Sequence, residues 1–319
     1  MAMRVTQSML SSNMLRNLNT SYNKMSKYQD MLNSGKKITR PSDDPVVAVK
    51  GMGYRVELEK NQQYQRNMDQ AHSWLDSTDE ALNQVGTVLI RMKELIVQAA
   101  NDSNTQEERN KIKEEIVQIK AHVQDLANTK VGENYIFSGT HTNQPLFQNG
   151  TINTNFEAVP DRTVDPTASL VAVEKSVEIN VFDGVSMKIN TNGVELFGDI
   201  NNFMKKVEDV FNSGAKGQEI GDLLGVAGSG SATTVDFLDG ITEKVLEVRA
   251  TVGGRQNRLE LMENRLSMQE INVTKQMSVN EDTDYAKTIT DMTTAESIHQ
   301  AALSVGAKII QQTLVDFIR

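Results

Sequence analysis

Residues 68–99 read MDQAHSWLDSTDEALNQVGTVLIRMKELIVQA, and their apolar side chains recur at alternating steps of three and four residues. This spacing places the apolar side chains on one face of a helix, and a pattern sustained over more than four heptads is typical of a coiled coil. The positions on this face are Met68, Ala71, Leu75, Thr78, Leu82, Val85, Leu89, Met92, Ile96 and Ala99. We therefore predict one long helix, from near Pro45 to just before Asn101, that buries this face against other helices.

Two further helices with apolar seams are predicted in the same part of the molecule. Residues 105–108, TQEE, have the pattern of a capping box and open a helix that continues to about Leu126. The short polar link before Thr105 predicts that this helix folds back antiparallel on the first. A heptad pattern returns from Leu238 to Val273 and predicts a long helix on the other side of the insert.

The segment between these helices has a different composition, rich in Gly, Asn, Thr and Asp. Residues 177–181 and 185–189 alternate polar and apolar side chains, and Asp183-Gly184 between them is a typical hairpin turn. We therefore predict a β-rich insert. It is expected to contain a strand and turn at 135–140, a short helix at about 199–212 and a loop at 213–232.

Both ends of the chain carry apolar seams at helical spacing, although chain ends usually fray. We predict a helix over about 4–34 and another after the break at 281–284. Such seams must be buried, so we predict that they contact neighbouring subunits. The candidate subunit-contact residues are Leu15, Leu18, Tyr22, Met25, Leu32, Ile289, Met292, Leu303, Ile310 and Phe317.

A joint between the first two helices is predicted from its prolines and aspartates. Gly35 suits the left-handed residue that ends a helix, and Asp44 before Pro45 suits the start of the next one. The candidate interdomain joint consists of Arg40, Pro41, Ser42, Asp43, Asp44 and Pro45.

Composition argues against several classes of function. The chain has a net charge of −9 and no basic stripe, so a nucleic-acid partner is not expected. No apolar run is long enough to cross a membrane, and the first residues do not resemble a secretory signal peptide. The chain has no cysteine, and its four histidines are scattered. We expect no catalytic site, no cofactor and no metal site, and we predict that the protein is not an enzyme.

Several motifs make the chain similar to the bacterial flagellin family. The helix break with its Asp43-Asp44 pair and the two helical segments that follow resemble those of flagellins. The segments that carry this resemblance are 34–38, 80–83 and 94–101. Other segments depart from filament flagellins and are similar to the hook–filament junction members of the family. These segments are 39–45, 135–140, 145–147, 252–259 and 314–317.

The predicted fold is mainly α with a β-rich insert, a flagellin-like rod of long coiled-coil helices formed by the two arms of the chain. Residues 1–44 and 283–319 are expected to form a terminal tube-lining domain. Residues 45–134 and 233–282 are expected to form a rod domain, and residues 135–232 an outer domain with a short helix.

The resemblance implies a secreted structural subunit at the junction of hook and filament, exported through the flagellar type III apparatus without a cleaved signal peptide. Its implied partners are further copies of itself in a ring, hook-associated protein 1, flagellin and a cytoplasmic export chaperone. No nucleic acid and no membrane are expected among them. The alternatives are a filament flagellin, a non-flagellar coiled-coil adaptor, and an enzyme housed in the insert, for which the sequence offers no nucleophile or cofactor loop.

Overall fold

The structure is a computed structural model that describes residues 7–101, 103–153, 176–214, 217–224 and 238–315, with the backbone alone at 7, 8, 10 and 308–315. The described chain is mainly helical with a small strand-containing insert, as the sequence predicts. It divides into two compact units. Unit 1 comprises residues 1–61 and 268–319, and unit 2 comprises residues 62–267. The three-part division made from the sequence stays a prediction.

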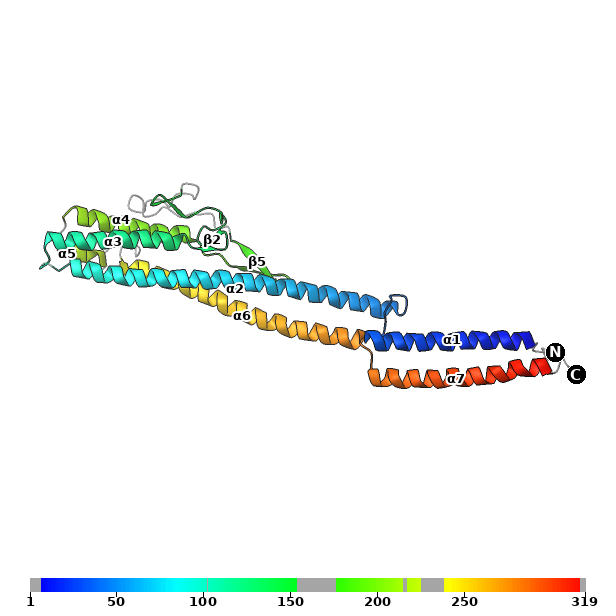
Figure 1. Cartoon of the computed structure of the whole chain (residues 1–319). Coiled ribbons are helices and arrows are strands. Elements are labelled where there is room, and N and C mark those ends of the chain that lie inside the picture. Colours follow the sequence, from blue (N-terminus) through cyan, green and yellow to red (C-terminus); the bar gives the residue numbers. More distant parts are fainter. Residues whose placement is uncertain (1–6, 102, 154–175, 215–216, 225–237, 316–319) are drawn as a thin grey trace. The chain divides into compact units, whose positions relative to one another are not determined.

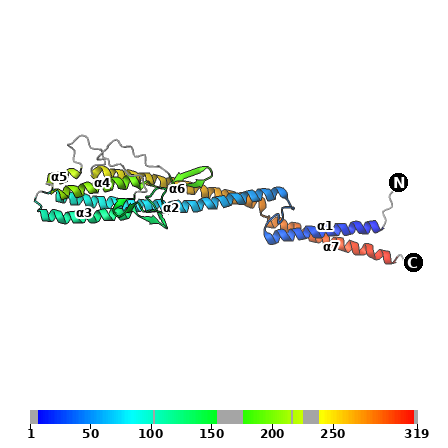
Figure 2. The ribbon, with the colours of Figure 1, turned by 90° about the horizontal axis from the view of Figure 1, so that it is seen from above.

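Unit 2 is built on four helices that lie side by side (Figures 1 and 2). They are α2 (Pro45–Ala99), α3 (Gln106–Ala127), α4 (Gly193–Asn212) and α6 (Leu238–Glu281), of which α2 and α6 continue into unit 1. All ten apolar-face positions of α2 predicted between Met68 and Ala99 are fully buried. The long helix of 55 residues, about 80 Å at 1.5 Å per residue, is thus confirmed together with its buried face.

The connection from α2 to α3 also agrees with the sequence. Thr105 accepts a hydrogen bond from the backbone of Glu108, whose side chain bonds back to the backbone of Thr105, so the capping box is formed. An ion pair of 2.7 Å between Arg91 and Glu115 joins the two antiparallel helices.

The insert contains three separate two-stranded antiparallel ladders. They are β1 (Lys130–Val131) with β2 (Asn134–Tyr135), β3 (Phe147–Gln148) with β4 (Thr151–Ile152), and β5 (Glu178–Phe182) with β6 (Val185–Lys188). The predicted β5–β6 hairpin is confirmed, and Gly184 in its turn has a φ of 70°. Glycine adopts this left-handed conformation without the steric strain that a side chain causes.

Three details of the insert differ from the prediction. The strand and turn expected at 135–140 are confirmed in part, because the strand stops at Tyr135 and the turn lies at Gly139 and Thr140. Helix α4 begins at Gly193 instead of about residue 199. The expected loop contains α5 (Gly217–Gly221) and a 3-10 turn, η1 (Asp222–Leu224), while its residues 225–232 lie outside the described chain.

The early start of α4 has a packing explanation. Asn192 caps the helix by accepting a hydrogen bond of 3.1 Å from the backbone of Val194. Phe197 in the first turns stacks edge to face on Phe137, with ring centroids 4.8 Å apart. A Cβ at Gly193 would lie 2.5 Å from that of Phe137. Tertiary packing therefore outweighs the poor helix propensity of glycine at the start of α4.

Unit 1 contains α1 (Gln7–Ser34), α7 (Tyr285–Val315), the first turns of α2 and the last turns of α6. Helices α1 and α7 run side by side in opposite directions (Figures 1 and 2). Gly35 ends α1 with a φ of 69°, as predicted, and α6 ends at Glu281.

Candidate assembly surface and the Glu281 clasp

Helices α1 and α7 bury one face of each against the other. Tyr22 lies level with His299, with ring centroids 6.3 Å apart, and Met14 fills the space beside Gly306. Most of the described positions that are at least half-buried follow heptad spacing on both helices, and Met31 and Asp291 lie beside this pattern. The heptad positions are Ser11, Met14, Leu18, Ser21, Met25, Tyr28 and Leu32 on α1, and Thr288, Met292, Ala295, His299, Ala302 and Gly306 on α7. These positions form an antiparallel coiled-coil core.

The candidate contact residues of α1 divide between this core and the surface. Leu18, Met25 and Leu32 are half-buried and face α7. Leu15 and Tyr22 expose 61% and 59% of their surface. The apolar pattern of α1 therefore holds two faces, of which one is covered by α7 and the other is exposed in the described part of the chain.

The candidate residues of α7 divide in the same way. Met292 is half-buried, whereas Ile289 and Leu303 are exposed. The side chain of Ile310 and the whole of Phe317 lie outside the described part of the chain.

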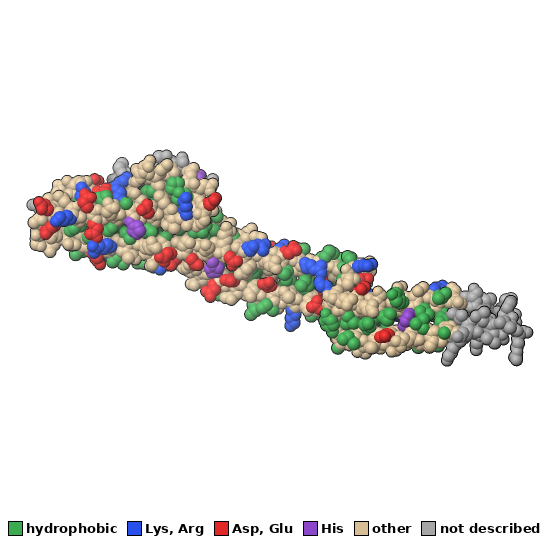
Figure 3. Space-filling model, in the orientation of Figure 1, with side chains coloured by type: hydrophobic (Ala, Val, Ile, Leu, Met, Phe, Trp, Pro, Cys, Tyr) green, Lys and Arg blue, Asp and Glu red, His purple; other side chains and the backbone are tan. Residues whose placement is uncertain are grey.

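The exposed candidate residues of the two helices lie on the same side of the pair. Leu15 and Tyr22 each follow a core position of α1 by one residue, and Ile289 and Leu303 do the same on α7. In an antiparallel pair, the two helices run in opposite directions, so the heptad positions follow opposite orders around the two helix axes. Equivalent heptad positions of the two helices therefore lie on the same side of the pair. We call Leu15, Tyr22, Ile289 and Leu303 the terminal flank. Figure 3 shows hydrophobic side chains along the surface of this helix pair.

The predicted joint is formed by a network of aspartate caps. Asp44 accepts hydrogen bonds of 3.0 and 3.1 Å from the backbone of Val46 and Val47, which confirms it as the N-cap of α2. Asp43 accepts a bond of 3.1 Å from the backbone of Arg40. This bond from Arg40 is the main reason that the pKa of the Asp43 carboxyl lies below its usual value. The remaining joint residues, Pro41, Ser42 and Pro45, are exposed.

A second set of contacts in unit 1 was missed by the sequence analysis. The carboxylate of Glu281, at the end of α6, is 4% exposed and accepts hydrogen bonds from two cations. Lys36 Nζ lies 3.0 Å from Oε2, and Arg55 Nη2 lies 2.7 and 2.6 Å from Oε1 and Oε2. A Cβ at Gly51 would overlap Oε1, so a side chain at this position of α2 would displace the carboxylate.

Backbone hydrogen bonds join the same two segments. The Lys37 amide donates to the carbonyl of Glu281 at 2.7 Å, and the Thr283 amide donates to the carbonyl of Gly35 at 2.9 Å. Together they tie the connection after α1 to the connection before α7. We call Gly35–Lys37, Gly51, Arg55 and Glu281–Thr283 the Glu281 clasp.

Burial and charge act in opposite directions on the Glu281 carboxyl. Burial raises its pKa, whereas the hydrogen bonds and positive charges of Lys36 and Arg55 lower it. The cations prevail, so the pKa lies below its usual range and Glu281 is ionised at neutral pH. A carboxylate 245 residues from one of its partners leaves no pattern in a single sequence, although Gly51 inside a helix is a signal of close approach.

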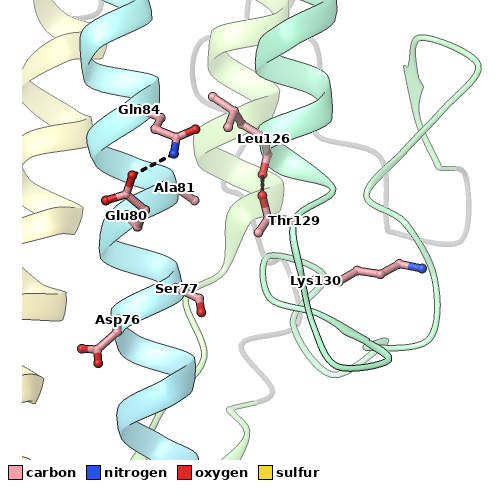
Figure 4. A pocket seen from close by; sticks show the side chains of 8 residues that line it. All are labelled: Asp76, Ser77, Glu80, Ala81, Gln84, Leu126, Thr129 and Lys130. Carbon is pink, nitrogen blue, oxygen red and sulfur yellow. Dashed lines mark hydrogen bonds between the residues drawn. The ribbon is translucent and has the colours of Figure 1, made fainter.

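One groove of unit 2 has no arrangement suited to catalysis. It measures about 490 Å³ and is lined by Asp76, Ser77, Glu80, Ala81, Gln84, Leu126, Thr129 and Lys130 (Figure 4). Gln84 donates to Glu80, and the Ser77 hydroxyl donates to the carbonyl of Ser73 in its own helix. Because the Ser77 hydroxyl donates to a backbone carbonyl and not to a base, it is not activated as a nucleophile.

Within the described residues, no group of three or more His, Cys, Asp or Glu side chains could hold a metal ion. None of the described helices is long and apolar enough to cross a membrane.

Two family models match the chain. The bacterial flagellin N-terminal helical region matches residues 5–142, and the bacterial flagellin C-terminal helical region matches residues 235–318. The flagellin of Clostridium tyrobutyricum is 25% identical, with 98% of this chain and 100% of the relative covered. The flagellar hook-associated protein 3 of Escherichia coli K12 is also 25% identical, with 94% of this chain and 95% of the relative covered.

Solved structures have a similar fold. A flagellar hook-associated protein from Vibrio parahaemolyticus has a TM-score of 0.60 at 22% identity, covering 75% of this chain and 99% of its own. The Bacillus cereus FlgL structure has a TM-score of 0.54 at 23% identity, covering 71% of this chain and 99% of its own.

Proposed function

The chain belongs to the bacterial flagellin family, and from this premise we propose that it is a structural subunit at the junction between flagellar hook and filament. Proteins of this family are structural and not enzymes. The subunit joins its neighbours through α1 and α7, whose terminal flank stays open in the single chain.

The terminal flank is the observation that carries the assembly part of the proposal. Its four apolar side chains are about half exposed or more, although α1 and α7 already pack on each other. A helix with apolar side chains outside its buried face leaves apolar surface in water, which is unfavourable. Such a helix is expected to bury this surface against a further partner. A second helix pair that covers this flank would complete the coiled coil.

The junction role is supported by sequence motifs and by similarity to hook-associated proteins. Overall identity does not separate the two roles, because the junction relative and the filament relative are both 25% identical to the chain. The segments at 39–45, 135–140 and 252–259 are similar to junction proteins and depart from filament flagellins. Membership of the flagellin family argues against a non-flagellar adaptor. A deletion experiment separates the junction role from that of a filament flagellin, the less favoured alternative.

A position at the hook–filament junction determines which proteins the chain contacts. Copies of the chain form a ring, with hook-associated protein 1 on the hook side and flagellin on the filament side. A cytoplasmic chaperone covers the exposed C-terminal seam before export through the flagellar type III apparatus, without cleavage of a signal peptide. Residues 1–44 and 283–319 line the tube, with Arg40–Pro45 as the joint to the rod.

Deletion of the gene tests the role. We expect electron micrographs of the mutant cells to show hooks without filaments, and we expect flagellin to be shed into the medium as monomer. A filament flagellin would instead leave hooks with no flagellin in the medium, unless another flagellin is made. Cells with normal filaments would refute the junction role.

The terminal flank is tested by complementing the mutant. Leu15→Asp and Leu303→Asp place charges on the flank, so we expect the chain to be exported into the medium but not retained on hooks. Val97→Asp is a matched control, because Val97 is an exposed apolar residue of α2 in unit 2. Retention of the flank variants at the wild-type level would refute assembly through this surface.

A further inference from the structure

Helix α2 carries a second uncovered apolar surface, on its first turns in unit 1. Val46, Val49, Met52 and Val56 recur at steps of three and four residues, and each exposes 51–64% of its surface. We call these four residues the α2 stripe. An amphipathic seam with this period is the pattern by which one helix packs on another.

The α2 stripe points away from the partner that α2 has within the chain. The inner side of α2 carries the buried Gly51 and Asn61 and reaches α6 through Glu57, whose carboxylate accepts a hydrogen bond of 3.0 Å from Gln269. At 100° per residue, Val49 and Val56 lie roughly opposite this inner side. The α2/α6 pairing therefore does not account for the stripe.

Gly53 lies within the α2 stripe and makes room for no neighbouring group in the described chain. A Cβ at this position would meet no atom within 4 Å, in contrast to Gly51, which makes room for Glu281. Glycine is the least favourable residue after proline in a helix interior. A glycine between apolar side chains on an open helix face suits the close approach of a helix from outside the chain.

Helix α6 carries exposed apolar side chains on its own outer side, with the exposed Lys275 between Ile271 and Val279. Met268, Ile271 and Val279 each expose 60–70% of their surface, and the inward Val273 between them is buried. We call Met268, Ile271 and Val279 the α6 stripe. The α2 stripe and the α6 stripe thus face outward from opposite sides of one antiparallel helix pair.

We propose that the α2 stripe of one copy packs on the α6 stripe of the next copy. This inference rests on the proposed function, because it adds a second contact to the assembly made by the terminal helices. Two different surfaces on opposite sides of one subunit form a heterologous contact, which generates a closed ring or a helical array. A ring or a helical array is what a subunit in the wall of a tube requires.

The size of the two stripes agrees with a contact made only within an assembly. Stable interfaces between free proteins use about 20–30 residues on each side. The two stripes together provide seven apolar side chains, so they do not hold a dimer of free chains. They act once the terminal helices have brought neighbouring copies together, by effective concentration.

Cysteine cross-linking tests the contact, because the natural chain has no cysteine. A chain with both Val49→Cys and Ile271→Cys is expressed in the deletion mutant, and isolated flagella are oxidised. We expect disulfide-linked dimers and higher multiples of this chain. A second pair, Val56→Cys with Met268→Cys, covers a different axial offset between the copies.

The single variants are the controls. Each alone should give no dimer, because a heterologous contact never brings two copies of the same residue together. Dimers from Val49→Cys alone would overturn the proposal in favour of a symmetric contact. Chains that are present in flagella but remain monomeric with both cysteine pairs would overturn it while leaving the proposed function intact. Absence of the chain from flagella would overturn both.

Gly53→Leu adds an independent test. The purified variant should fold with unchanged helix content, because the space at residue 53 is open. We expect its amount in isolated flagella to fall at least tenfold. Gly86→Leu is the matched control, since a Cβ at Gly86 also meets no atom within 4 Å and lies outside both stripes. Equal incorporation of the two variants would overturn the proposal.

Discussion

The Glu281 clasp gives a prediction whose size follows from its contacts. Glu281→Gln keeps the shape of the side chain and one oxygen acceptor but removes its charge. In the unmodified chain, the carboxylate accepts one hydrogen bond from Lys36 and two from Arg55. Hydrogen bonds to charged groups contribute about 1.5–3 kcal/mol each, roughly twice as much as neutral ones.

The exposure of the two cations lowers the free energy that these hydrogen bonds contribute. The side chains of Lys36 and Arg55 are 44% and 50% exposed, so water solvates them once the charge of Glu281 is gone. The neutral amide still accepts at least one hydrogen bond. We therefore expect Glu281→Gln to lower the free energy of opening the clasp by about 2 kcal/mol, below the 3–5 kcal/mol typical of a broken fully buried pair.

Native-state hydrogen exchange measures this opening at the amides of Lys37 and Thr283, which bond across the clasp. A change of about 2 kcal/mol corresponds to roughly 30-fold faster exchange at 25 °C. The control is Glu115→Gln, which removes the same type of pair with Arg91, where both side chains are about half exposed. That surface pair should change protection by less than about 0.5 kcal/mol.

Two results would refute this reasoning. One is an equally small effect of the two substitutions on their nearby amides. The other is a lack of protection at Lys37 and Thr283 in the unmodified protein, which would mean that the clasp is open in the free chain.

Three further predictions concern the cap, the core and pH. Asp44→Ala removes the N-cap of α2 and should destabilise its first turn by about 1 kcal/mol, measured by exchange at the Val47 amide; no change would exclude a capping role. Leu82→Ala removes a fully buried side chain and should lower the free energy of unfolding of unit 2 by about 2–5 kcal/mol in denaturant titrations, whereas the exposed Ile90→Ala should lower it by less than about 0.5 kcal/mol. Because the folded-state pKa of Glu281 is lowered, its stabilisation is complete above the unfolded value of about 4.3 and is lost as pH falls through the lower folded-state value. Protection at Lys37, corrected for intrinsic exchange, should therefore decrease below about pH 4.3 and lose this dependence in Glu281→Gln.

The long helices could be predicted because their signal is local and periodic. The ten apolar-face positions of α2 are all fully buried, and the caps at Asp44 and Thr105 form as their sequence patterns indicate. Each of these features depends on residues within a few positions of one another. Such features depend little on tertiary contacts, so a single sequence is sufficient to predict them.

The features that were missed depend on contacts between distant residues. Phe137 stabilises the start of α4 and draws Gly193 into a helix against its propensity. Glu281 meets Lys36 and Arg55 only after the two arms of the chain have come together. The apolar pattern of the terminal helices was found, but periodicity cannot show which of two neighbouring faces, at Leu18 or at Leu15, is covered by α7.

The clasp also has a physical consequence for assembly through α1 and α7. Each of these helices is joined to the rest of unit 1 by its own connection, at Gly35–Asp44 and at Glu281–Asp284, and two independent connections would let the helices move separately. A flank built from both helices binds tightly only if they are held in register before a neighbour arrives, because ordering them on binding reduces affinity. The bonds between Gly35–Lys37 and Glu281–Thr283 make the two connections one structural unit. Loosening the clasp should therefore weaken incorporation into flagella under conditions in which α1 and α7 remain helical, and a Glu281→Gln chain that opens faster yet incorporates normally would show that this preorganisation is not needed.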